Sequence, residues 1–169
     1  MAITAEQQTG ILEVAIGLFN AAPGKIYNTE LANLVDVNGG NLSISELADL
    51  LDDTPAFKDN ILVGNVTIED QANILLNNFG LVADDDPASA GSQAKQFFED
   101  ELTADKGLGE IVIEAINYLK GTPAPEFVAT ATLLANKVLV AQAYTAVGSS
   151  TDVAILQTVL SKVTGDAPY

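Results

Sequence analysis

The fold is decided by the stretch TAEQQTGILEVAIGLF, which spans Thr4 to Phe19. A threonine followed three residues later by a glutamine forms a capping box, the pattern that marks the start of a helix. Apolar side chains then recur at helical spacing, at Ile11, Leu12, Ala15, Ile16 and Phe19. We therefore predict a helix from about Ala5 to Asn20, ended by Pro23-Gly24.

Two more helices are predicted to follow this one. Asn28 or Thr29 is expected to cap a short helix with an apolar side formed by Leu31, Leu34 and Val35. The capping box of the next helix is Ser43-Ile44-Ser45-Glu46, and we expect Thr54-Pro55 to end that helix. The turn between the two helices contains Asn38-Gly39, which also fits a β-hairpin. We prefer helix, turn and helix because a capping box follows directly, with a short β-bridge as the alternative.

The second third of the chain resembles the first. Thr67-Ile68-Glu69-Asp70-Gln71 and the residues after it match the stretch from Thr4 at Thr, Glu, Gln, Ile and Leu, with one constant offset. Each stretch later reaches a Thr-Pro-Ala sequence, at Thr54 and at Thr122. We predict two weakly similar helical repeats, at about 3–58 and about 66–124, within a single domain, 1–169. Chance similarity between amphipathic helices is the alternative.

The remaining sequence predicts two C-terminal helices, at about 125–165. The first runs from about Glu126 to Val147 and is apolar on two faces, so we expect it to lie between other elements. Ser150 or Thr151 is expected to cap the second. The fold class that follows is all-α: a compact multi-helix domain of two repeats plus two C-terminal helices.

Composition excludes several classes of function. The formal net charge is −16, with 23 acidic residues against seven lysines, and arginine is absent. Such a chain repels phosphate backbones, so we expect no nucleic-acid partner. Histidine and cysteine are absent too, which removes the usual general bases, nucleophiles and zinc ligands. We expect no enzyme and no cofactor. Apolar runs are short, so we expect no membrane insertion, and the N-terminus lacks the pattern of a cleaved signal.

Two loops are candidates for calcium. Asp36, Asn38 and Glu46 resemble the ligands of an EF-hand loop, but the glutamate falls one residue too early and is also explained by its capping box. Asp84, Asp85 and Asp86 form a denser group of carboxylates, the ligands that hard cations prefer. A solvated acidic turn is the alternative interpretation.

Part of the sequence resembles a known kind of module. It looks like the amino-terminal helical modules of bacterial surface-layer and repeats-in-toxin type secreted proteins, and like the tandem helical domain of unknown function found in them. The residues that carry the resemblance are Ile11-Leu12, Leu18-Phe19-Asn20-Ala21-Ala22-Pro23-Gly24, Tyr27, Glu30-Leu31, Ser43-Ile44-Ser45-Glu46-Leu47-Ala48 and Thr54-Pro55-Ala56-Phe57-Lys58. The Gly-Arg-x-Pro-Asp and Tyr-Trp elements usual in that domain are missing, so no ligand site is transferred.

The resemblance implies a secreted or cell-surface protein, exported without a cleaved N-terminal signal. The implied function is structural: self-assembly, or cell-surface anchoring of a surface-layer-like or adhesin-like protein. The expected partners are further copies of the chain, as a homo-oligomer or filament, and cell-surface glycan or lipopolysaccharide. The alternative function is an intracellular helical scaffold that binds partner helices.

Overall fold

The computed structural model describes residues 3–64 and 66–166. In these ranges the chain forms nine α-helices and one 3₁₀ helix and contains no β-strand, which confirms the all-α fold class. The elements are α1 (Ala5–Phe19), α2 (Lys25–Val35), α3 (Ile44–Asp52), α4 (Pro55–Asn60), α5 (Ile68–Asn78), α6 (Ala90–Thr103), α7 (Leu108–Lys120), η1 (Pro125–Phe127), α8 (Val128–Val147) and α9 (Val153–Leu160).

Capping boxes start three of the helices, as the sequence indicates. The side chain of Thr4 accepts a hydrogen bond from the backbone of Gln7, and the Gln7 side chain accepts one from the Thr4 backbone. Ser43 and Glu46 form the same reciprocal pair at α3. At α5, Thr67 forms it with an aspartate, Asp70. Each pair satisfies backbone N–H groups that have no partner within the helix.

The predicted start of the second helix is wrong. This helix begins at Lys25, with Gly24 as an N-cap that makes no side-chain hydrogen bond. The Lys25 N–H instead donates to the carbonyl of Gly148, 2.7 Å away and far along the chain. Asn28 lies inside the helix, where its amide side chain pairs with that of Gln8. A tertiary contact therefore starts this helix.

The predicted end of α3 is confirmed, whereas the predicted cap of α9 is wrong. Thr54-Pro55 ends α3 but also starts α4, because the Thr54 hydroxyl accepts a hydrogen bond from the Phe57 N–H and proline is suited to the first helical position. The N-cap of α9 is neither Ser150 nor Thr151 but Asp152, whose carboxylate accepts the first free N–H groups of the helix. Between α2 and α3, Asn38-Gly39 lies in a turn without a bridge, which confirms helix, turn and helix.

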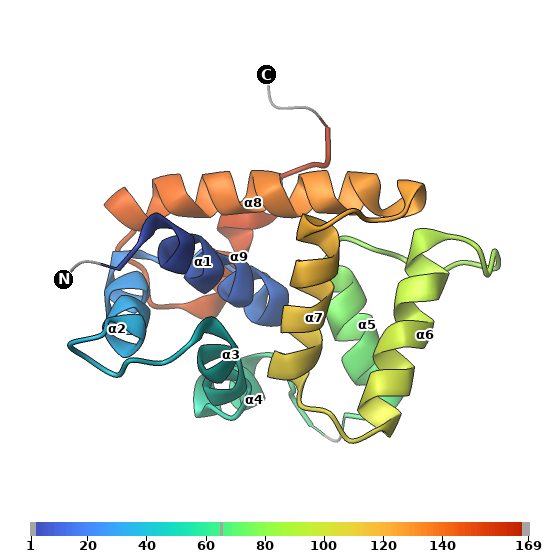
Figure 1. Cartoon of the computed structure of the whole chain (residues 1–169), viewed down its shortest axis with the longest axis horizontal. Helices are drawn as coiled ribbons and strands as arrows, with labels where there is room; N and C mark the ends of the chain where they lie inside the picture. Colours follow the sequence, from blue (N-terminus) through green and yellow to red (C-terminus); the bar gives the residue numbers. More distant parts are fainter. Residues whose placement is uncertain (1–2, 65, 167–169) are drawn as a thin grey trace.

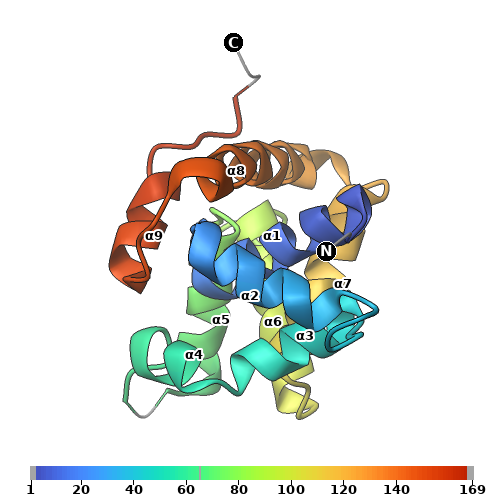
Figure 2. The same ribbon diagram turned by 90° about the vertical axis from the view of Figure 1, so that its left-hand side faces the viewer.

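The central element is α1. Every residue from Gly10 to Leu18 is buried, because α2, α3, α5, α7 and α8 all pack against this helix. Figure 1 shows α3 and α4 below α1, and α5, α6 and α7 to its right, and Figure 2 shows α2 and α3 on the side that faces the viewer. Buried residues of both predicted repeats belong to one apolar cluster, and α3 packs directly against α7. The repeat itself stays a prediction.

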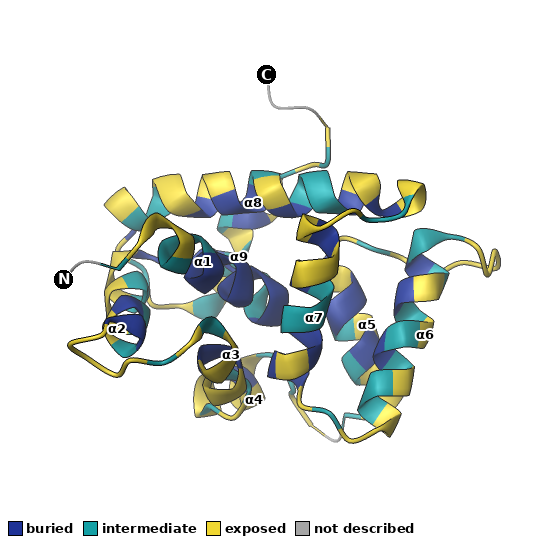
Figure 3. Cartoon of the chain, viewed as in Figure 1, coloured by how far each residue is buried: buried dark blue, intermediate teal, exposed yellow. Residues whose placement is uncertain are grey.

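Helix α8 forms an outer layer across the molecule, seen along the top of Figure 1. The expectation that it lies between other elements is wrong. Its inner side covers α1 with buried residues that include Leu134, Val138 and Ala141. Its other side is exposed, as the yellow outer edge of α8 in Figure 3 shows. The two apolar faces of this helix therefore have different surroundings.

Replacing Gly109 by alanine is expected to lower the free energy of unfolding by about 1–3 kcal/mol. A Cβ atom at this position of α7 would lie 2.5 Å from the backbone carbon of Ala48 in α3, a contact that neither helix can relieve by rotating a side chain. Gly121→Ala is the matched control, because its Cβ would make only ordinary contacts. Chemical denaturation of the three proteins measures the difference. Equal stabilities of both variants would contradict the close contact.

Candidate functional site

The first calcium candidate is occupied by hydrogen bonds of the protein itself. Asp36 is buried at the end of α2, and its carboxylate accepts hydrogen bonds from the backbone and side-chain nitrogen atoms of Asn38, at 2.8 and 3.2 Å. Glu46 accepts the Ser43 N–H at 2.8 Å, and this hydrogen bond holds the pKa of Glu46 below its usual value. The Glu46 carboxylate is therefore part of the capping box that begins α3.

The second candidate lies in the exposed loop before α6. One carboxylate oxygen of Asp84 accepts the Asp86 N–H at 3.0 Å, and Asp86 in turn accepts the Ala88 N–H at 2.9 Å. The Ser89 side chain and the Asp86 N–H hold the pKa of Asp84 below its usual value. Within 3–64 and 66–166 no group of three or more acidic side chains is arranged to hold a metal ion. Calcium binding by Asp84, Asp85 and Asp86 stays a prediction.

A buried polar cluster surrounds the C-terminal end of α1. The ammonium group of Lys137 in α8 donates to the side-chain oxygen of Asn20 at 2.7 Å and to the backbone carbonyl of Asn78 at 2.8 Å. The Asn78 side chain donates to the carbonyls of Gly17 and Leu18. From α9, Gln157 donates to the carbonyl of Phe19 at 2.8 Å.

This cluster satisfies carbonyls that the end of any helix leaves without partners. A positive charge is also favourable at a helix C-terminus. The sequence analysis did not find it, although one signal was available: Lys137 is the single charged residue of α8 and shares its buried side with Leu134, Val138 and Ala141. The hydrogen bonds of this cluster join α1 to α5, α8 and α9, which is a structural role.

The exposed side of α8 is unusual for so acidic a protein. The helix carries no acidic residue, and its lysine is buried. The side chains of Val128, Leu139 and Val147 are 53, 58 and 80% exposed. A continuous uncharged surface on a chain with a net charge of −16 is the kind of feature that marks an interaction site.

The spacing along this surface is regular. Steps of four and three residues alternate through Val128, Thr132, Ala135, Leu139, Gln142 and Ala146. This is the a/d spacing with which two helices pack side by side in a coiled coil. We call these six residues the α8 seam. Each is exposed except Thr132, which is half-buried.

Comparison with known proteins gives no relative. No protein-family model, curated protein or solved structure matches this chain.

By length and composition alone, the segment Pro125–Val147 would be able to cross a membrane. A helix that covers a protein core passes the same test, and the inner side of α8 does cover α1. The buried Lys137 lies at the middle of this segment and is held there by hydrogen bonds to other helices. What the α8 seam offers chemically is contact area without charge, apolar except at Thr132 and Gln142.

Proposed function

We propose that this protein is a non-enzymatic structural module that associates with further copies of itself through the α8 seam. The observation that carries the proposal is an exposed, uncharged stripe at coiled-coil spacing on a chain of net charge −16. A secreted or cell-surface setting rests on the sequence resemblance to surface-layer proteins.

Charge favours a second copy as the partner on this surface. Two copies that approach each other through other faces bring carboxylates together, and self-repulsion opposes such contacts. The α8 seam avoids that cost. Its smallest members, Ala135 and Ala146, lie on either side of Leu139 and Gln142 along the seam and allow two helix backbones to approach closely. A second copy related to the first by a two-fold axis would bring the α8 seams of the two chains together, so that both chains use the same surface.

The size of the seam sets the strength of association. A helix of 20 residues is about 30 Å long, and one pair of such helices buries less than the ~800 Å² per partner of a standard stable interface. We therefore expect weak, concentration-dependent association. Salt should promote it, since ~150 mM salt shortens the Debye length to ~8 Å.

Replacing Leu139 by glutamate is expected to weaken this association at least ~tenfold. The substitution places carboxylates opposite each other at the centre of the seam, where neither has a partner. Sedimentation velocity over a range of protein concentrations, at low salt and at ~150 mM salt, measures the effect. Circular dichroism checks that the exposed substitution leaves the helices intact.

Val82→Glu is the matched control, because Val82 is 82% exposed but lies far from α8 in sequence, in the loop before α6. This variant should associate like the unchanged protein. A wild-type chain that remains monomeric under all these conditions would refute the proposal and leave a different partner helix as the occupant of the seam.

A further inference from the structure

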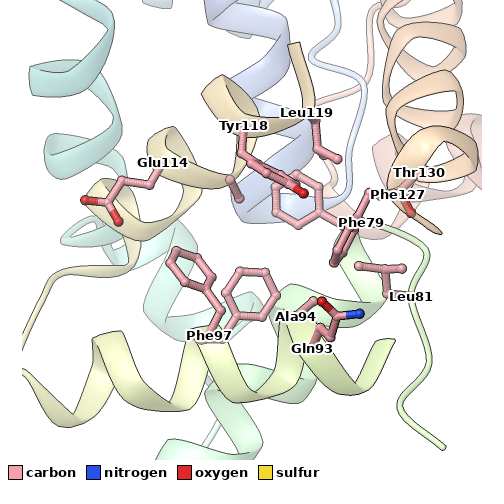
Figure 4. A pocket seen from close by; sticks show the side chains of 12 residues that line it. Phe79, Leu81, Gln93, Ala94, Phe97, Glu114, Tyr118, Leu119, Phe127 and Thr130 are labelled. Carbon is pink, nitrogen blue, oxygen red and sulfur yellow. The ribbon is translucent and has the colours of Figure 1, made fainter. Parts of the chain in front are cut away.

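A second feature of the molecule is a cavity of about 340 Å³. It lies between α6, α7 and η1, and Phe79 at the end of α5 also lines it (Figure 4). This volume falls within the range of ~300–1,000 Å³ that is typical of small-molecule sites. Its residues take no part in the α8 seam.

Five of the twelve residues that line this cavity are aromatic. The chain has six phenylalanines and four tyrosines, and half of these rings line this one cavity: Phe79, Phe97, Phe98, Tyr118 and Phe127. The rings also brace one another. Tyr118 and Phe127 meet edge to face with centroids 5.5 Å apart, and Phe98 contacts both Phe79 and Phe97 at 6.2 and 5.5 Å. Such contacts hold the cavity open in a fixed shape and offer a ligand apolar and aromatic surface.

One polar group in the wall is available to a ligand. Thr130 is buried to 6% exposure, and its hydroxyl forms no hydrogen bond in the described part of the chain, unlike that of Thr132, which donates to the carbonyl four residues earlier. Every fully enclosed side-chain oxygen or nitrogen in the same ranges does have a partner. The Thr130 hydroxyl therefore keeps some accessible surface, and Thr130 is one of the residues that line the cavity.

The charges at the rim are negative. Glu114 lines the cavity, and Gln93 at the opposite edge donates to Glu126 at 3.0 Å. The backbone N–H of Glu126 and the Gln93 side chain hold the pKa of Glu126 below its usual value, so this carboxylate is ionised at neutral pH. Lysine is absent from the lining, and Lys106 is already bound to Glu101 and Glu114. An anionic ligand would meet like charge here.

We propose that this cavity binds a neutral, largely apolar small molecule, with a hydrogen-bonding group that meets Thr130. The aromatic wall supplies the contact area, and Thr130 orients the polar end. The acidic rim selects against carboxylates such as free fatty acids. Because the cavity shares no residue with the α8 seam, the proposal of ligand binding and the proposal of self-association can be tested independently of each other.

Titration with N-phenyl-1-naphthylamine, a neutral fluorescent apolar probe, tests the proposal. We expect a saturable rise in fluorescence with one probe bound per chain. Ala115→Phe, which fills the cavity from α7, should weaken probe binding at least ~tenfold. Ala94→Leu fills it from α6 and provides a second test if the first variant loses its helical circular dichroism. Leu139→Glu should bind the probe normally.

The matched control uses another apolar hollow, of about 270 Å³, lined by residues of α2, α3 and α4 that include Leu31, Leu50 and Ala56. Ala56→Phe fills that hollow and should leave probe binding unchanged.

Competition then tests the ligand class. Decanol should displace the probe, decanoate should compete at least ~tenfold more weakly, and Thr130→Val should weaken decanol several-fold by removing one hydrogen bond. The proposal would be overturned if the probe did not bind saturably. It would also be overturned if Ala56→Phe weakened probe binding as much as Ala115→Phe does, or if decanoate competed as strongly as decanol.

Discussion

Replacing Phe57 by alanine is expected to lower the free energy of unfolding by about 3–5 kcal/mol. Phe57 has no exposed surface, and its ring meets that of Phe19 edge to face, with centroids 5.3 Å apart. The substitution removes the contact between α4 and the end of α1 and leaves a cavity that the surrounding helices fill only partly. Chemical denaturation followed by circular dichroism measures the loss.

The control for Phe57 is Val63→Ala, because Val63 is 72% exposed. We expect this variant to differ from the unchanged protein by less than ~0.5 kcal/mol. A Phe57→Ala protein that is as stable as this control would show that α4 contributes nothing to the core.

The second large effect is a rise in stability with pH that depends on Lys137. Burial lowers the pKa of Lys137 from its ordinary value of 10.5 to about 8 in the folded protein. Between these two values the unfolded chain binds a proton that the folded chain has released, so raising the pH favours the fold. From pH 7.5 to pH 9.5 we expect a gain of about 2 kcal/mol from this one residue.

Comparison with the Lys137→Met variant separates the effect of Lys137 on the pH dependence of stability from the effects of all other titrating groups. The variant leaves Asn20 and the Asn78 carbonyl without their donor, which shifts its stability by an amount that does not depend on pH. Denaturation curves of both proteins at pH 7.5, 8.5 and 9.5 give the difference. If the free energy of unfolding changed with pH by the same amount in the two proteins, the pKa of Lys137 would not be lowered by folding.

Sequence reasoning predicted the features that are local. The capping box of α1 is complete within Thr4 and Gln7, so four residues determine where the helix begins. The box of α3 is equally local, and it correctly favoured a turn over a hairpin at Asn38-Gly39. The all-α class followed from these signals together with apolar spacing.

Features that depend on distant residues were missed. Lys25 begins α2 because its N–H meets the carbonyl of Gly148, and no nearby residue signals that contact. Apolar spacing indicated two apolar faces on α8 but could not tell which one meets α1. The Lys137 cluster joins α1, α5, α8 and α9, and a lysine in an apolar strip does not reveal its partners. The aromatic cavity likewise combines residues from several elements.

The enclosure of α1 has a consequence for how the chain folds. The hydrogen bonds from Lys120 to Glu13, from Lys137 to Asn20 and from Gln157 to Phe19 join residues that are 107, 117 and 138 positions apart. Contacts of such long range close slowly, because the entropy of the loop between them is lost first. Of the helices that pack against α1, α2 and α3 follow it directly in the chain, whereas α7 and α8 lie far from it in sequence. The side of α1 that α8 covers, and the carbonyls that Lys137 and Gln157 satisfy, therefore stay open to solvent until the C-terminal helices have formed and docked.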